Sequence, residues 1–125
     1  MKKDIENRED LYLLLSDFYK KLLSDHEMKH FFEKFNTKNS LEEHLQILVD
    51  FWDNILFYSN TYKKNAMLPH IELNKSKPFK KLNFDIWLSH FFQSIDDNFT
   101  GENSEIAKNR ARSIATVMQL KILKF

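Results

Sequence analysis

The histidines are the side chains of this chain best suited to chemistry, because there are five of them and no cysteine. His26 and His30 stand four residues apart, which places both on one face of a helix. That spacing suits two metal ligands, but a zinc site needs further ligands and no third lies near them in the sequence. We interpret both as surface histidines. His90 lies opposite the apolar side of its helix, and we expect it to face solvent as well.

His44 and His70 have different surroundings. His44 occupies the apolar face of a predicted helix, and a buried imidazole needs partners for its nitrogens. Taken alone, a core histidine bonded to a backbone carbonyl is the simpler interpretation. His70 follows Pro69 in a stretch of weak periodicity between two aromatic-rich helices, and by itself it would be interpreted as a loop histidine.

The elements that must position these residues are helices. The 125 residues include one glycine, two prolines and twelve phenylalanines. An all-β domain needs many tight turns, and a Rossmann domain or P-loop needs a glycine-rich phosphate turn, so these classes are excluded. The lack of cysteine excludes disulfides, zinc ribbons and thiol catalysis. A net charge of +1 gives no general attraction to nucleic acids or anionic membranes.

Length and hydropathy predict one domain spanning residues 1–125. Hydrophobic residues make up 42% of the chain and charged residues 30%, as in a folded protein. The first residues are polar and contain no apolar signal core. No apolar run approaches the ~20 residues of a membrane span. We therefore expect a cytoplasmic protein without membrane or nucleic-acid partners.

Apolar residues with helical spacing predict an all-α fold. Asn7 is the expected cap of the first helix, and a short segment follows near Asp25. Residues 36–39 are expected to form a loop before a capping box at Ser40 opens the next helix. The expected inner positions of these segments are Leu11, Leu14, Leu15, Phe18 and Leu22, then Met28, Phe31, Phe32 and Phe35, then Leu41, His44, Leu45, Leu48, Phe51, Trp52, Ile55 and Leu56.

Two more helices are predicted after a lysine-rich stretch. The first begins near Asn83 and ends at Gly101, where a left-handed residue is least strained. Ser104 is the expected cap of the last. Their inner positions are Phe84, Trp87, Leu88, Phe91, Ile95 and Phe99, then Ala107, Ala111, Ile114, Ala115, Met118 and Ile122, and the alanines allow a neighbouring helix to approach closely.

The order of aromatic residues and histidines resembles that of the truncated haemoglobins, and specifically their third group. The residues that carry the resemblance are Phe18-Tyr19, Phe32, His44 eight residues before Trp52, Pro69-His70-Ile71-Glu72-Leu73 and Phe84-Asp85-Ile86-Trp87-Leu88. The similarity spans roughly residues 8–122. It implies a truncated globin fold, a sandwich of two helices on two around a haem.

The resemblance also implies a role for each candidate site residue. His70 corresponds to the proximal histidine, which would make it the metal ligand of a haem b (iron protoporphyrin IX). The haem would be held without covalent attachment, because there is no Cys-x-x-Cys-His motif. The remaining matches are Tyr19 as the distal tyrosine, His44 as the distal histidine, Trp87 beside the distal pocket, Phe32 packed on the porphyrin and Leu48 lining the distal side.

The implied function is reversible binding of dioxygen or nitric oxide, as in bacterial oxygen-transport proteins. The same pocket would serve a haem enzyme that detoxifies nitric oxide or reduces peroxide with the help of a reductase, and the sequence does not separate the two. A cofactor-free helical interaction module would also explain the amphipathic helices. It would not explain why His44 lies on an apolar face.

Overall fold

Helices carry the fold of the part of the chain that the computed structural model describes, which comprises residues 2–35, 37–58 and 80–122, with side chains up to residue 119. This confirms the all-α prediction. None of the described helices combines the length and apolar character that a membrane crossing requires. The elements are α1 (Arg8–Ser24), the short 3-10 helix η1 (Lys29–Phe35), α2 (Lys38–Phe57), α4 (Lys81–Asn98) and α5 (Glu102–Ile122).

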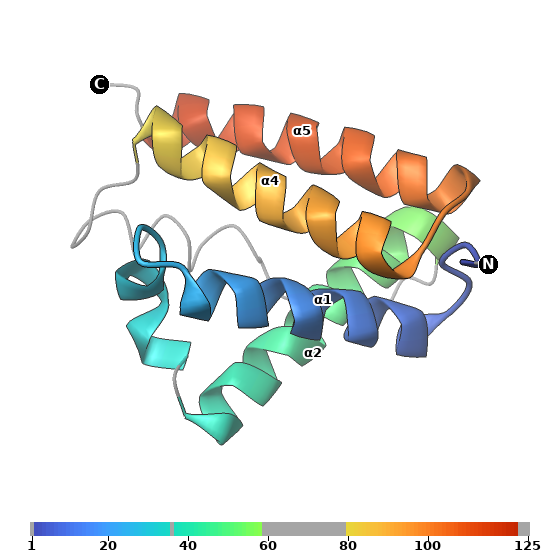
Figure 1. Cartoon of the computed structure of the whole chain (residues 1–125). Coiled ribbons are helices and arrows are strands. Elements are labelled where there is room, and N and C mark those ends of the chain that lie inside the picture. Colours follow the sequence, from blue (N-terminus) through green and yellow to red (C-terminus); the bar gives the residue numbers. More distant parts are fainter. Residues whose placement is uncertain (1, 36, 59–79, 123–125) are drawn as a thin grey trace.

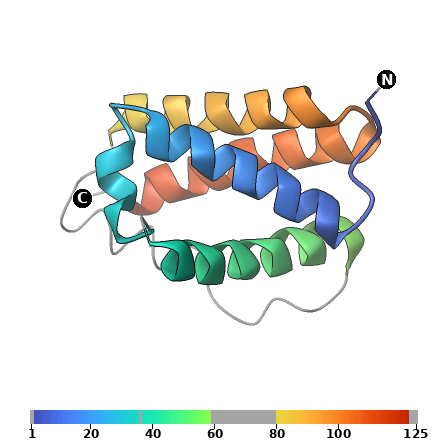
Figure 2. The same ribbon diagram turned by 60° about the horizontal axis from the view of Figure 1, so that its bottom comes forward.

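The long helices pack as two pairs. The helices α4 and α5 run antiparallel beside each other, and α1 crosses over α2 (Figure 1). The pairs meet where α1 packs against α4, and the second view shows α2 on the far side of α1 from α4 (Figure 2). The short helix η1 contacts both α1 and α2. The arrangement is a sandwich of two helix pairs, as the resemblance implies.

The predicted inner faces form the core. The apolar stripe of α1 is almost completely buried, and so are the phenylalanines of η1 and the inner face of α4. Three alanines of α5 lie buried on the side of the helix that faces its neighbours, as the close approach of α4 requires. These alanines are Ala107, Ala111 and Ala115.

The predicted helix starts are confirmed in one case and corrected in another. The side chain of Asn7 accepts a 2.9 Å hydrogen bond from the Asp10 amide, so it caps α1 as expected. The capping box at Ser40 is wrong. Thr37 is the cap of α2, and its hydroxyl oxygen accepts from the Ser40 amide at 3.2 Å. Residues 38 and 39 are therefore helical rather than part of a loop, because Thr37 offers an equivalent hydroxyl one turn earlier.

The prediction for the end of α4 is also wrong. The helix begins two residues before Asn83 and ends at Asn98, and its C-cap is Phe99 in an extended conformation. Gly101, with φ +139°, instead lies directly before α5. A Cβ atom there would lie 2.5 Å from Cγ of Asp4, so only glycine fits this position without displacing the Asp4 side chain.

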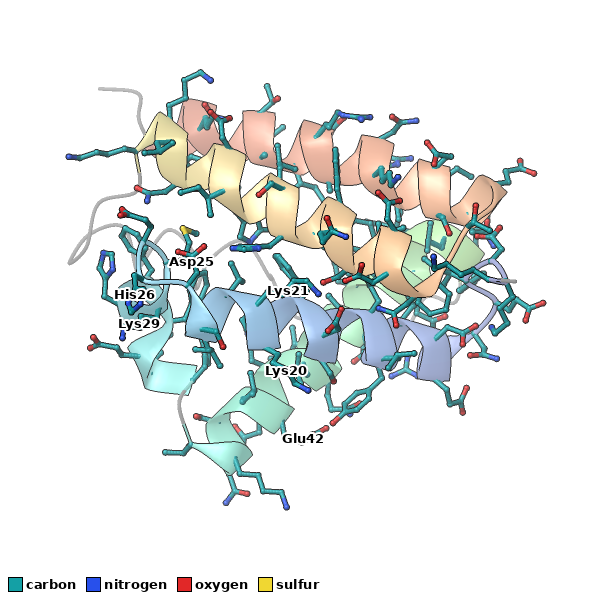
Figure 3. All side chains as sticks on the ribbon, in the orientation of Figure 1. Lys20, Lys21, Asp25, His26, Lys29 and Glu42 are labelled. Atoms are coloured by element: carbon teal, nitrogen blue, oxygen red, sulfur yellow. The ribbon has the colours of Figure 1, made fainter. Side chains whose placement is uncertain are left out.

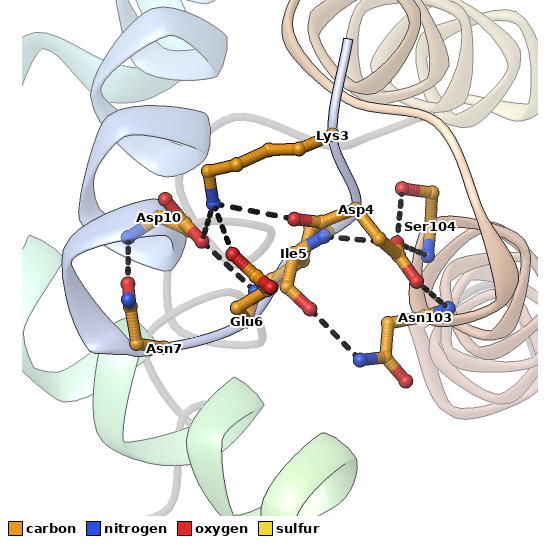
Figure 4. A network of polar contacts seen from close by, with 8 residues as sticks. All are labelled: Lys3, Asp4, Ile5, Glu6, Asn7, Asp10, Asn103 and Ser104. Carbon is orange, nitrogen blue, oxygen red and sulfur yellow. Dashed lines mark hydrogen bonds and ion pairs between the residues drawn. The ribbon is translucent and has the colours of Figure 1, made fainter.

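Asp4, rather than Ser104, caps the last helix (Figure 4). Its carboxylate accepts 2.8 Å hydrogen bonds from the amides of Asn103 and Ser104 and from the Ser104 hydroxyl. Burial alone would raise the pKa of Asp4, but these bonds and one from the Ile5 amide outweigh burial and hold the pKa below its ordinary value. The carboxylate also lies at the positive end of the α5 dipole. A residue near the start of the chain thus supplies the cap that Gly101, without a side chain, does not.

Candidate functional site

A hydrogen bond between two buried side chains joins α1 to α2 at the centre of the candidate site. The Tyr19 hydroxyl lies 2.7 Å from Nε2 of His44. Tyr19 is 1% exposed and His44 is 5% exposed. The sequence correctly indicated that His44 is buried and needs a partner, but this partner of Nε2 is a phenol rather than a backbone carbonyl. Both residues face the interior from helices that pack together. Because buried polar groups are nearly always hydrogen-bonded, this shared orientation is what could have predicted their contact.

Burial determines the protonation of Tyr19. Removal from water disfavours the phenolate and raises the pKa of Tyr19 far above its ordinary value. The side chain therefore keeps its proton and remains a hydrogen-bond donor at any physiological pH. A hydroxyl oxygen also accepts hydrogen bonds, so Tyr19 can accept from His44 and donate elsewhere at the same time.

The short helix η1 covers this pair with aromatic rings. The Phe35 ring stacks on the His44 imidazole with centroids 4.1 Å apart and planes 14° apart. The Phe32 ring meets Tyr19 edge-on at 5.6 Å. Backbone angles at Phe32 depart from the helical range, with φ −116° and ψ 20°, so η1 is kinked at this residue. Both rings are buried, so the two polar groups sit in a water-poor surrounding.

Trp87 reaches the same region from α4. Phe18 connects it to Tyr19, because the Phe18 ring meets Trp87 and Tyr19 edge-on, each at 5.5 Å. Trp87 is 7% exposed, and its indole nitrogen Nε1 has no hydrogen-bond partner among the described residues. Leaving a buried donor unpaired costs about 1–3 kcal/mol. An acceptor for this atom must therefore come from outside the described residues.

The structure brings most of the predicted site residues into one interior. Tyr19, His44 and Phe32 are connected by the contacts above, and Phe18 connects Trp87 to them. Leu48 is buried one helical turn after His44 on α2. His70 lies outside the described residues. Phe35 was expected only as a core position, and Phe18 as a core position and as part of the Phe18-Tyr19 pair in the resemblance. Their spacing did not show that they contact the polar residues.

The remaining histidines give a mixed outcome. His26 and His30 are exposed, as expected, and no group of three metal-ligating residues occurs within the described ranges. The expectation that His90 faces solvent is wrong. Its Nε2 lies 2.6 Å from Oδ2 of Asp25, at the end of α1 beside His26 (Figure 3). The His90 side chain holds the pKa of Asp25 below its ordinary value.

Comparisons with known proteins support the resemblance. No family model matches the chain. The chain is 26% identical, over 127 aligned residues, to the group 3 truncated hemoglobin ctb of Campylobacter jejuni, covering 100% of this chain and 98% of that protein. The crystal structure of a group III truncated hemoglobin from Campylobacter jejuni superposes with a TM-score of 0.86 at 26% identity, covering 99% of this chain and 97% of the other. The predicted similarity and the truncated globin fold are both confirmed.

Proposed function

From the truncated globin fold and the full-length similarity to group 3 truncated haemoglobins, we propose that this protein is a haem protein that reversibly binds a diatomic ligand, dioxygen or nitric oxide. The observation that carries the proposal is the buried cluster of donors in an aromatic interior. Tyr19, His44 and Trp87 supply three groups able to donate hydrogen bonds, where a core built for stability alone would hold apolar side chains.

The residues present fit a haem. Nε1 of Trp87 lacks a partner within the described ranges, which is expected where a bound ligand supplies the acceptor. The group would be haem b, with His70 as the iron ligand and with Phe32 and Leu48 in apolar contact with the porphyrin. When bound, it would supply an iron atom with an open position for the diatomic ligand. The cofactor-free interaction module explains neither the unpaired indole nor the buried Tyr19–His44 pair.

Tyr19 would act as the main donor to the ligand. For this role its proton must point away from His44, so the bond between them must run from Nε2–H of His44 to the phenol oxygen. We therefore propose that His44 carries a proton on Nε2. His44 would then orient the Tyr19 hydroxyl toward the ligand, and Trp87 would supply a second donor from α4.

The same donors favour a second candidate function. Hydrogen-bond donors on the distal side of a haem decide between ligand binding and activation of an O–O bond. The buried Tyr19–His44 pair therefore also suits an enzyme that detoxifies nitric oxide or reduces peroxide, with a reductase as its partner. Turnover with a physiological reductant separates the enzyme from the carrier.

We further propose that the chain is a single domain and acts in the cytoplasm.

An absorption spectrum tests the proposal directly. The purified protein should take up one haem b per chain and show the spectrum of histidine-ligated ferrous haem. His70→Ala should abolish that spectrum, whereas His26→Ala, which changes an exposed histidine, should leave it intact. An unchanged spectrum in His70→Ala would assign the ligand to another residue. A protein that takes up no haem would refute the proposed function.

A further inference from the structure

The position of the His44 ring depends on more than its bond to Tyr19. A hydrogen bond at Nε2 fixes one atom of the imidazole, and the ring plane can still rotate about that atom. The Phe35 ring lies nearly parallel to this plane, with centroids 4.1 Å apart. Face-to-face contact over the whole ring resists rotation, because any tilt of the imidazole would drive it into the Phe35 ring.

Phe35 is itself held in place. It is the last residue of η1 and is 8% exposed, and its ring also meets Tyr19 edge-on, with centroids 6.4 Å apart. The ammonium group of Lys34 lies 5.2 Å from the centre of the Phe35 ring. A ring held between these neighbours presents a fixed surface to His44.

The corner that leads into η1 is anchored to two helices. The Asp25 carbonyl accepts hydrogen bonds from the amides of Met28 and Lys29 at 3.1 and 2.8 Å. The Asp25 carboxylate pairs with His90 on α4. A side-chain amide of Asn83, also on α4, donates to the sulfur of Met28 at 3.8 Å. The direction of η1, and with it the place of Phe35, is therefore set by contacts outside the site.

We propose that Phe35 is a positioning residue for His44. By stacking on the imidazole it keeps Nε2 directed at the Tyr19 hydroxyl and keeps the ring from swinging out of the interior. This inference rests on the proposed function, because it concerns the residue that orients the ligand donor. Stacking between two aromatic rings should shift the equilibrium between the inward and outward positions of the His44 ring by about 2- to 10-fold.

The test compares three variants of the full chain. Phe35→Leu keeps an apolar side chain but removes the ring, and Phe35→Tyr restores a ring of the same shape. Phe99→Leu is the matched control, because Phe99 is 3% exposed but follows α4 at the opposite end of the molecule from η1 (Figure 1). We expect the two leucine variants to lose similar free energies of unfolding. A change at His44 that occurs only in Phe35→Leu then reports positioning by Phe35 rather than general weakening of the core.

The first measurement is the nuclear Overhauser effect between the Tyr19 and His44 rings, whose centroids lie 5.2 Å apart. It is recorded on the diamagnetic carbon monoxide form or, for a chain that takes up no haem, on the protein alone. Phe35→Leu should weaken this signal and broaden the His44 ring resonances by exchange. The second measurement is carbon monoxide association. It should accelerate about 2- to 10-fold in Phe35→Leu, because a His44 ring that swings out of the interior no longer obstructs ligand entry. Phe35→Tyr and Phe99→Leu should behave like the unmodified protein.

The proposal is overturned if Phe35→Leu keeps the full Tyr19–His44 signal, or if Phe99→Leu changes it equally. It is also overturned if Phe35→Tyr lacks the Tyr19–His44 signal or the carbon monoxide association rate of the unmodified protein. Failure of the proposed function has a different signature, because a chain that takes up no haem still gives the Tyr19–His44 signal. The two hypotheses are therefore tested by separate observations.

Discussion

The hydroxyl of Tyr19 and Nε2 of His44 lie 2.7 Å apart in the interior, and this contact connects α1, which carries the proposed main ligand donor, to α2, which carries the residue proposed to orient it. Each side chain alone has an ordinary explanation as a core residue. Together they form a polar pair surrounded by aromatic rings. Whether Nε2 of His44 carries a proton determines whether the Tyr19 hydroxyl can donate to a ligand. Two of the predictions below follow from this pair, and two follow from the cap of α5.

Tyr19→Phe should accelerate dissociation of dioxygen by about 10- to 100-fold. The phenol donates to the partly negative outer atom of the ligand, and a charge-assisted bond of this kind is worth roughly 1.5–3 kcal/mol. The substitution keeps the ring and its packing. Carbon monoxide is a much poorer acceptor, so its dissociation should change far less. Stopped-flow measurements on both gases check this.

Tyr12→Phe is the control for that experiment, because Tyr12 lies on the same helix at the surface and its hydroxyl donates to Glu42. It should leave both dissociation rates unchanged. Equal acceleration of both gases in Tyr19→Phe would show a steric role. An unchanged oxygen rate would remove Tyr19 from the site.

His44→Leu should mainly accelerate ligand association, by about 10-fold. We predict that His44 in its inward position acts as a gate that obstructs ligand entry. The bond to Tyr19 and the stack on Phe35 together favour this position by about 1.4 kcal/mol, and the substitution removes the obstruction. Tyr19 keeps its proton, so dissociation should change less than in Tyr19→Phe. Flash photolysis with carbon monoxide measures the association rate. A variant in which dissociation changes far more than association would contradict the role of His44 as a gate.

Asp4→Asn should lower the free energy of unfolding by about 1 kcal/mol at pH 7, because it removes the charge that caps α5. The folded state holds the pKa of Asp4 below its ordinary value of 3.8. A lowered carboxyl pKa contributes stability that is complete above the unfolded value and is lost as the pH falls through the folded one. The difference between the two proteins should therefore shrink below about pH 4. Urea unfolding at pH 7, 5, 4 and 3 measures it, and a difference independent of pH would exclude the carboxylate as its source.

Gly101→Ala should lower the free energy of unfolding by about 2–4 kcal/mol. The positive φ strains any residue with a Cβ atom, and that atom would push the Asp4 side chain away from the helix. Because the cap can be lost only once, the double variant with Asp4→Ala should lose about 1 kcal/mol less than the two single variants predict together. Thr100→Ala, at the exposed neighbouring position, is the control. Strict additivity would show that the strain of Gly101→Ala is independent of the cap.

The sequence predicted which helices form and which faces they bury, because both depend on local spacing. The ends of the helices were less predictable. Thr37 and Ser40 both suit a cap, and only the structure shows that the earlier one is used. The cap from Asp4 was beyond local reasoning, since it comes from 100 residues away.

The candidate site was likewise predictable where it depends on local sequence and not where it depends on contacts between distant residues. The sequence pattern alone indicates His44, because a histidine is unusual on an apolar face, whereas Tyr19 and Trp87 are indicated only by the resemblance. The pairing of Tyr19 with His44 and the stack of Phe35 on His44 depend on how α1, α2 and η1 pack. The spacing of apolar residues along the chain does not predict this packing. The pairing of His90 with Asp25 was missed for the same reason, because the two residues are 65 positions apart.

The long-range cap of α5 also has a consequence for biosynthesis. Asp4 leaves the ribosome 100 residues before Ser104, the residue whose amide it receives. At about 5–20 residues per second, this is an interval of roughly 5–20 seconds. During that time the N-terminal segment has no partner at the start of α5, while α1 and α2 can already pair. Asp4, one of the first residues to be synthesised, is therefore among the last to make its final contacts, and a nascent chain stalled before residue 103 should leave it accessible to protease.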